Sequence, residues 1–228
     1  MGVRENLQTV GDRILTAARR AGRDPEKIKI IAVSKQVPVE SIKEVLGAGI
    51  TDLGENRVQE MTSKMDQLPS GLRWHMIGHL QTNKVKYVVG EVALIHSLDR
   101  WDLARAIEQR ADALNVVVPV LVQVNVSGEK SKFGLRPGEL ADFLAALQDF
   151  RRIKVKGLMT MAPYADDPEE ARPFFRELRQ LAGRLAVSLP GVSLEHLSMG
   201  MTNDFEVAVE EGADLLRLGT AVFGARTY

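Results

Sequence analysis

The sequence predicts an α/β fold: a single TIM-type (β/α)8 barrel with an extra N-terminal helix. Two observations support this prediction. Short apolar runs rich in β-branched residues alternate strictly with amphipathic helical stretches, and eight such runs can be counted. The intervening loops are short, and no low-complexity linker divides the chain. A length of 228 residues fits one large barrel as well as two small domains, and the unbroken alternation favours one domain over residues 1–228.

The first half begins with apolar residues at helical spacing over residues 1–22, before any strand. We expect this helix to cover the bottom of the barrel. The first strand, residues 28–35, is a β-branched run that ends in Lys35. The elements that follow are a helix at 39–49, a strand at 52–56, a helix at 57–68, a strand at 73–79, a helix at 82–89, a strand at 93–98 and a helix at 100–114.

The second half continues the alternation to the C-terminal region. Its predicted elements are a strand at 117–126, a helix at 137–150, a strand at 153–161, a helix at 168–189, a strand at 194–199, a helix at 204–211 and a strand at 215–222. An open doubly wound sheet would require no particular number of strands, whereas a closed parallel barrel requires eight.

The composition excludes several classes of function. Lys plus Arg equals Asp plus Glu at 30 each, so net charge gives no general reason to expect nucleic acid or an anionic membrane as a partner. The absence of cysteine excludes disulfides, thiolate metal sites and cysteine nucleophiles. No apolar run reaches spanning length, and the N-terminal residues carry charge throughout. We therefore expect a soluble, cytoplasmic protein.

Polar residues gather where the predicted strands end, which is the edge of a parallel barrel that carries its site. The polar residues are Lys35, Glu55, Asn56, His79, Ser97, Asp99, Asn125, Ser127, Ser198, Arg217 and Thr220, and two glycines, Gly200 and Gly219, lie among them. From its strand alone, Lys35 is either a solvated strand end or an amine that forms a Schiff base with a carbonyl compound. Glu55 is more consistent with a packing role than Asn56 is.

The last two strands suggest a phosphate site. Ser198 and Gly200 follow one strand, and Gly219 and Thr220 end the next, where barrels often bind phosphate. Arg217 points to the same face as Gly219 but one layer deeper, and a cation there indicates a buried acceptor. Together these residues provide a lysine for an aldehyde, a phosphate site across the barrel mouth and an arginine between the two. Pyridoxal 5′-phosphate (PLP) has an aldehyde, a ring nitrogen and a phosphate in a matching arrangement. An arginine at the ring nitrogen keeps it unprotonated and weakens the ring as an electron sink.

Five motifs in these positions resemble the pyridoxal phosphate homeostasis protein family, the short relatives of the alanine racemase N-terminal barrel. They are Ala-Val-Ser-Lys at 32–35, Gly-Glu-Asn-Arg-Val-Gln-Glu at 54–60, Trp-His-Met-Ile-Gly-His-Leu-Gln-Thr-Asn-Lys at 74–84, Leu-Ser-Met-Gly-Met at 197–201 and Arg-Leu-Gly-Thr-Ala-Val-Phe-Gly at 217–224. The resemblance implies that Lys35 is the Schiff-base lysine and that Arg217 faces the pyridine nitrogen. It further implies a phosphate held by Ser198, Gly200, Gly219 and Thr220, with Asn56 and His79 against the cofactor.

One departure from alanine racemase bears on activity. That enzyme has a second domain whose tyrosine acts as a base, whereas this sequence stops at Tyr228, and its only other tyrosines are Tyr87 and Tyr164. Racemisation needs a proton donor on each face of the substrate, so we expect no efficient racemase activity. The resemblance implies PLP buffering and delivery, with apo PLP-dependent enzymes as recipients. We expect a monomer, because the racemase dimer contact has no counterpart here.

Two alternatives remain open from the sequence. One is a PLP-dependent enzyme with weak amino-acid racemase or lyase activity. The other is a phosphosugar enzyme with Lys35 as an aldolase-type amine, against which Arg217 argues because a sugar phosphate has no ring nitrogen to meet it.

Four histidines and one loop have simpler interpretations. His75 and His79 lie about 13 Å apart along a strand, too far to share a metal, so no metal site is predicted. His96 and His196 are expected to be hydrogen-bonded structural residues. The loop at 127–134 carries Lys130 and Lys132 and is expected to be solvated. As a hypothesis, Lys132 passes the aldehyde onward to a recipient.

Overall fold

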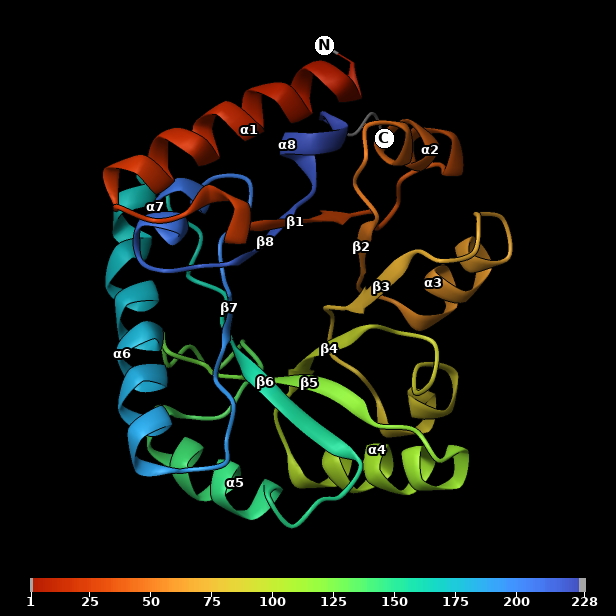
Figure 1. The fold of residues 1–228 in the computed structure, drawn as a ribbon, viewed down its shortest axis with the longest axis vertical. Coiled ribbons are helices and arrows are strands. Elements are labelled where there is room, and N and C mark those ends of the chain that lie inside the picture. The colour runs from red at the N-terminus through yellow and green to blue at the C-terminus, as the bar shows by residue number, and fades with distance from the viewer. Residues whose placement is uncertain (1, 226–228) are drawn as a thin grey trace.

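The computed structural model describes residues 2–225 and contains a closed barrel of eight parallel strands. Each strand pairs with its neighbour in chain order, and β8 returns to pair with β1 (Figure 1). The strands are β1 (Lys29–Val33), β2 (Asp52–Glu55), β3 (Arg73–Met76), β4 (Leu94–Leu98), β5 (Val118–Gln123), β6 (Ile153–Met159), β7 (His196–Ser198) and β8 (Leu215–Leu218). The predicted (β/α)8 barrel is confirmed.

Helices surround the strands (Figure 1). The α-helices are α1 (Val3–Arg20), α2 (Val39–Gly47), α3 (Val58–Met65), α4 (Trp101–Leu114), α5 (Leu140–Leu147), α6 (Arg172–Ser188), α7 (Phe205–Glu210) and α8 (Thr220–Phe223). The 3₁₀ helices of the described residues are η1 (Pro25–Lys27), η2 (Thr82–Tyr87), η3 (Pro137–Glu139) and η4 (Pro168–Ala171). The predicted helix at 82–89 is thus a shorter 3₁₀ helix that ends at Tyr87, because valines are poor helix formers and Gly90 follows with a φ of +96°.

The last strand is shorter than predicted. It ends at Leu218 instead of residue 222, and the chain turns at Gly219 into α8. The carbonyl of Gly219 accepts hydrogen bonds from the N–H groups of both Val222 and Phe223, at 2.9 Å each. A run of apolar residues therefore becomes a helical turn at the barrel mouth, since the glycine carbonyl starts a helical hydrogen-bond pattern.

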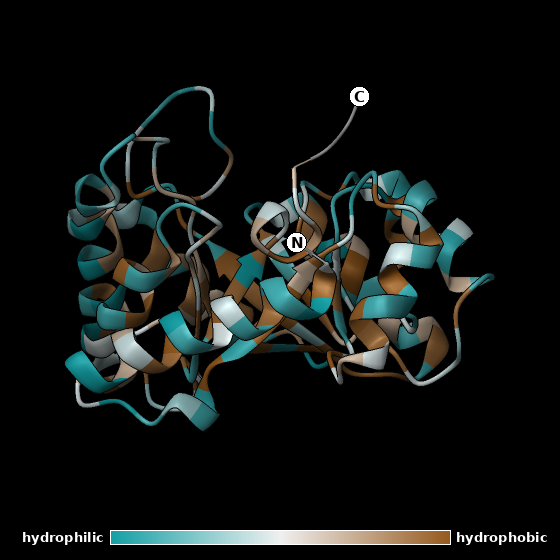
Figure 2. Cartoon of the chain, turned by 90° about the horizontal axis from the view of Figure 1, so that it is seen from above, coloured by the Kyte–Doolittle hydropathy of each residue, from teal (hydrophilic) through white to brown (hydrophobic). Residues whose placement is uncertain are grey.

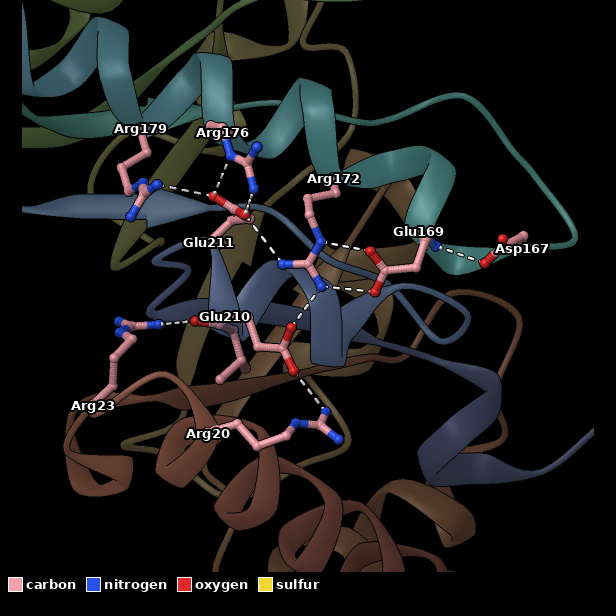
Figure 3. Close-up of polar contacts among 10 residues, drawn as sticks. Arg20, Arg23, Asp167, Glu169, Arg172, Arg176, Arg179, Glu210 and Glu211 are labelled. Carbon is pink, nitrogen blue, oxygen red and sulfur yellow. Dashed lines mark hydrogen bonds and ion pairs between the residues drawn. The ribbon is translucent and has the colours of Figure 1, made fainter.

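The sequence predicted that the N-terminal helix covers the bottom of the barrel, and this prediction is wrong. The helix lies on the outside, packed against α7, α8 and α2 (Figure 1). Arg13 pairs with Glu206 and Arg20 pairs with Glu210, both at 2.7 Å, so α1 is tied to α7 by charge as well (Figure 3 shows the second pair). The reason is that α7 and α8 have only six and four residues, and they leave apolar surface that α1 covers.

Buried apolar residues of the strands and helices form one large core cluster. Hydrophilic residues lie mostly on the outer parts of the helices (Figure 2). A smaller cluster forms separately from Ile31, Leu94, Leu121, Met159 and Leu215, one residue from each of five strands. Because side chains alternate along a strand, Arg217 lies on the same side of β8 as Leu215. None of the helices within residues 2–225 has the length and apolar character needed to cross a membrane.

Candidate functional site

A cavity of about 600 Å³ opens at the carboxyl ends of the strands. Six of the eight residues predicted from the sequence as cofactor ligands line it: Lys35, Asn56, His79, Arg217, Gly219 and Thr220. They come from β1, β2, β3 and β8 or from the turns that follow these strands. The structure therefore brings together side chains that are up to 185 residues apart in the sequence (220 − 35).

Two side chains of α3 that form an ion pair, Lys64 and Glu60, hold the backbone on both sides of Lys35 by hydrogen bonds. The Lys64 ammonium donates to the carbonyl of Ser34 at 2.5 Å and pairs with Glu60 at 2.6 Å. The Glu60 carboxylate in turn accepts the N–H of Gln36 at 2.5 Å. Gln36 has a φ of +56°, a left-handed conformation that non-glycine residues adopt rarely. Lys35 thus stands in a turn whose two neighbouring peptide groups are fixed from outside the barrel.

Glu55 belongs to this support and not to the cavity. It is fully buried, and its Oε1 accepts from the Ser34 hydroxyl and from Lys64, each at 2.7 Å. Burial raises the pKa of the Glu55 carboxyl, and the hydrogen bonds from Lys64 and Ser34 only partly oppose this effect. The packing role expected for Glu55 is confirmed, and the adjacent Asn56 lies on the cavity wall instead.

Arg217 is the buried cation of the site, with 4% of its surface exposed. Its guanidinium donates to the Ser198 hydroxyl at 2.6 Å and to the carbonyl of Thr160 at 2.8 Å. Burial lowers its pKa to about 10, against the attraction of Asp204. Arg217 therefore stays charged at neutral pH while it faces the cavity.

Ser198 and Gly200 lie behind the cavity wall. Ser198 is fully buried, and its hydroxyl contacts Arg217 and His96. Gly200 has a φ of +92°, and a Cβ atom there would lie 2.6 Å from the Cβ of Ala208, so only glycine fits. The assignment of these two residues to a phosphate stays a prediction.

Four residues that the sequence analysis did not select line the cavity next to Gly200. They are Met201, Thr202, Asn203 and Asp204. The Thr202 hydroxyl accepts the N–H of Ala221 at 3.1 Å, which joins this loop to α8. Burial raises the pKa of Asp204 although the N–H of Met201 and the charge of Arg217 act in the opposite direction. The signal for three of them was available, because the polar run at 202–204 comes shortly after the end of a strand.

The opposite side of the cavity carries an aromatic pair. The ring of His79 stacks on Phe133 with centroids 3.9 Å apart and planes 21° apart. Burial and the charge of Arg100 lower the pKa of His79, with Asp99 opposing them, so the imidazole is neutral at pH 7. Phe133 and its neighbour Lys132 reach the cavity from the loop after β5. The expectation for that loop was a solvated segment, with cofactor transfer by Lys132 as the alternative hypothesis, and part of the loop is a wall of the cavity.

Asn56 owes its position to a close backbone contact. A Cβ atom on Gly78 would lie 2.4 Å from the carbonyl oxygen of Asn56. Glycine at position 78 therefore lets the chain after β3 pass against the chain after β2.

The remaining histidines are hydrogen-bonded, as predicted. His96 is fully buried and contacts His75 at 3.0 Å and Ser198 at 2.9 Å. His196 contacts the carboxylate of Asp214 at 2.5 Å. Within the described residues, no three His, Asp or Glu side chains are grouped so that they could hold a metal ion.

Comparison with known proteins places these features in a family. The family model for the alanine racemase N-terminal domain matches residues 6–227. The pyridoxal phosphate homeostasis protein of Aquifex aeolicus (strain VF5) is 48% identical over 229 residues, which cover all of both chains. This chain belongs to the pyridoxal phosphate homeostasis protein family. The Escherichia coli (strain K12) member of that family is 37% identical over 235 residues, covering 99% of this chain and 97% of the other.

A solved structure is also similar to this chain. PipY of Synechococcus elongatus PCC7942, solved with PLP bound, superimposes with a TM-score of 0.83 at 34% identity. The match covers 97% of this chain and all of PipY. The family membership and the similarity to PipY agree with the barrel fold over nearly the whole chain.

Proposed function

We propose that this protein binds PLP in the barrel-mouth cavity as a Schiff base on Lys35. The barrel acts as one PLP-binding domain in intracellular PLP homeostasis, buffering and delivering the cofactor without efficient racemase activity. The observation that carries this proposal is the position of Lys35 and Arg217 on one cavity, at the ends of the paired strands β1 and β8. The PLP-bound structure of PipY supports it.

The donors around the cavity match the groups of PLP. The Lys35 amine would meet the aldehyde, and the Arg217 guanidinium would meet the ring nitrogen. Gly219 and Thr220, joined by Thr202 and Asn203, would hold the phosphate. Ser198 and Gly200 would support that wall from behind, and Asn56 and His79 would lie against the cofactor. A volume of about 600 Å³ is within the range of small-molecule sites.

The charge on Arg217 bears on the reactivity that bound PLP would have in this site. Bound PLP supplies an aldehyde for amines and a ring that can accept electrons. A guanidinium that stays protonated would donate a hydrogen bond to the ring nitrogen, and its positive charge would disfavour protonation of that nitrogen, so the ring would remain a weak electron sink. Apo PLP-dependent enzymes are the proposed recipients, and the proposed state is a monomer.

The test is the visible absorbance of the purified protein before and after borohydride, for the parent chain and for Lys35→Ala. We expect a yellow band that borohydride bleaches, with the reduced label mapped to Lys35, and no such band in the variant. Lys130→Ala is the matched control, because that lysine is exposed on a loop and does not line the cavity. A parent protein that stays colourless after incubation with PLP would overturn the proposal.

One observation favours a second candidate, a PLP enzyme with weak racemase or lyase activity. Tyr164 lines the cavity with 80% of its surface exposed, and a tyrosine there could act as a base. Tyr87 is not on the cavity and lies beside Lys84 and Lys86. Tyr228 lies outside the described residues.

Deuterium incorporation at the α-carbon of alanine separates the two candidates. A carrier exchanges this hydrogen no faster than free PLP does. An enzyme that uses Tyr164 exchanges it faster, and Tyr164→Phe removes most of the excess, about 100-fold or more for a lost general base.

A further inference from the structure

A continuous chain of hydrogen bonds crosses the protein from the bottom of the barrel to the cavity. The His75 Nε2 lies 2.8 Å from Asp52 Oδ1, and the His75 Nδ1 lies 3.0 Å from His96 Nε2. The His96 Nδ1 lies 2.9 Å from the Ser198 hydroxyl, which accepts from Arg217 Nη1 at 2.6 Å. We call these five residues the Asp52–Arg217 chain. They come from β2, β3, β4, β7 and β8.

The donors and acceptors of this chain can be ordered in only one satisfied way. An ionised Asp52 only accepts and Arg217 only donates, so both ends are defined. The His75 Nε2–H donates to Asp52, the His96 Nε2–H donates to His75, and the Ser198 hydroxyl donates to His96. In the reverse order His96 would donate to Ser198, and the Ser198 proton would have no acceptor among the hydrogen bonds of residues 2–225. Leaving a buried donor without a partner is costly.

The charges along the chain agree with this order. Burial holds the pKa of His96 well below its usual value, and positive charge on His75, Arg217 or His196 acts in the same direction. His96 is therefore neutral and has one acceptor nitrogen for Ser198. Burial works to raise the pKa of Asp52, but hydrogen bonds from His75 and Arg73 prevail and lower it. The carboxylate is thus ionised at the end where the order requires an acceptor.

We propose that Asp52, His75 and His96 are positioning residues that turn the Ser198 lone pair toward Arg217 and so orient its guanidinium for the ring nitrogen of the ligand. The identity of that ligand rests on the proposed function, whereas the order of the chain is a property of the protein alone. Because its proton is directed to His96, the Ser198 hydroxyl cannot also donate to a phosphate. Without the chain, the hydroxyl could rotate and Arg217 would lose one of its two acceptors.

The first part of the test needs no ligand. Nitrogen-15 NMR of the unloaded protein at pH 7 should show His75 and His96 as neutral rings, each protonated at Nε2. A proton on Nδ1 of His96 would overturn the proposed order even if PLP binds well.

The second part measures selectivity for the ring nitrogen. The readout is the ratio of the dissociation constants of PLP and of its 1-deaza analogue, which has carbon in place of that nitrogen. We expect the preference for PLP to fall about tenfold in Ser198→Ala, the loss of a charge-assisted hydrogen bond. Asp52→Leu should also lower the preference for PLP, although four successive hydrogen bonds separate Asp52 from Arg217. Asp52→Asn retains an acceptor oxygen and should keep the parental preference.

His196→Leu is the matched control, because His196, which lies on β7, also pairs with an aspartate, Asp214, but is outside the Asp52–Arg217 chain. It should leave the preference unchanged. A preference that is equal in the parent, Ser198→Ala and Asp52→Leu would reduce the chain to a packing role. Failure of the parent to bind PLP would instead remove the proposed function, and the NMR result would still decide the order of the chain. If Asp52→Leu does not fold, Ser198→Ala and the NMR spectrum carry the test.

Discussion

Gly78 shows how one missing side chain shapes the cavity wall. Its backbone passes so close to Asn56 that a methyl group would lie 2.4 Å from a carbonyl oxygen. Since the obstacle is backbone, it cannot rotate away as a flexible side chain would. The position of Asn56 in the site therefore depends on a residue with no side chain of its own.

We predict that Gly78→Ala lowers the free energy of unfolding by about 1–3 kcal/mol, the usual cost of overpacking. It should also weaken PLP binding, because Asn56 must move. Urea unfolding and PLP titration measure the two effects. Gly183→Ala is the control: it lies in α6 with no atom within 4 Å of the added methyl and should stabilise the helix by about 0.5–1 kcal/mol. Equal stability of Gly78→Ala and the parent would contradict the close contact.

Lys132 supports a prediction about cofactor delivery. It lines the cavity and pairs with Glu129 at 2.5 Å, within the loop after β5. If this amine passes the aldehyde onward, Lys132→Ala slows PLP transfer to an apo-enzyme about tenfold while resting occupancy stays the same. Stopped-flow reactivation of the recipient measures the rate, with Lys130→Ala as control. An unchanged transfer rate would remove Lys132 from the delivery step.

At the residue scale, strand periodicity predicted which side chains share a face but not how deep each lies. Lys35 and Arg217 were expected at the barrel mouth because each ends or interrupts an apolar strand, and both line the cavity. Ser198 has the same sequence signature, yet it lies behind the wall, because Arg217 occupies the space in front of it. Its hydrogen bond to His96, 102 residues earlier, depends on the closed barrel and could not be read from local spacing.

At the scale of elements, a buried carboxylate joins α6 to the end of α7. Glu211 is 3% exposed and pairs with Arg172, Arg176 and Arg179 at 3.1, 2.8 and 3.0 Å (Figure 3). The three arginines follow one face of α6 at helical spacing. Burial works to raise the pKa of Glu211, but the hydrogen bonds from Arg176 and Arg172 prevail and lower it. The contact therefore favours the ionised carboxylate.

From this we predict a pH-dependent contribution to stability. A carboxyl with a lowered pKa in the folded state stabilises fully above its unfolded pKa of about 4.3 and loses this effect as the pH falls further. Glu211→Gln should lower the free energy of unfolding by about 2 kcal/mol at pH 7, with the difference shrinking toward pH 3. Urea unfolding across this range measures it. The exposed Glu44→Gln should change stability by no more than about 0.5 kcal/mol, and a pH-independent loss for Glu211→Gln would contradict the ion pairs.

The order and type of the elements could largely be predicted, whereas some of their ends could not. Residues 215–222 are apolar enough for one strand, and only Gly219 hinted that α8 would begin there. The segments that begin at Pro137 and Pro168 were each predicted as one helix. Each starts instead as a 3₁₀ turn, because proline supplies no N–H and suits only the first turn of a helix.

At the scale of the whole molecule, the count of eight alternating strands was sufficient to predict closure. The place of α1 was not predictable, since its apolar face would suit the barrel bottom as well as the gap left by α7 and α8. That choice depends on the lengths of helices nearly 200 residues later in the chain. The pairing of Lys29 with Leu215 and of Ala32 with Leu218 shows that the barrel is closed between β1 and β8.

This pairing has a consequence for synthesis on the ribosome. The first strand to emerge, β1, has one unpaired edge until the last strand, β8, is synthesised. The apolar face of α1 likewise stays uncovered until α7 and α8 are synthesised. During nearly the whole of translation, an apolar strand edge and a helix face therefore stay uncovered, and both can join neighbouring nascent chains. We therefore expect a chaperone to bind α1 and β1 until the complete chain leaves the ribosome, because the two ends of the sequence pack against each other in the folded barrel.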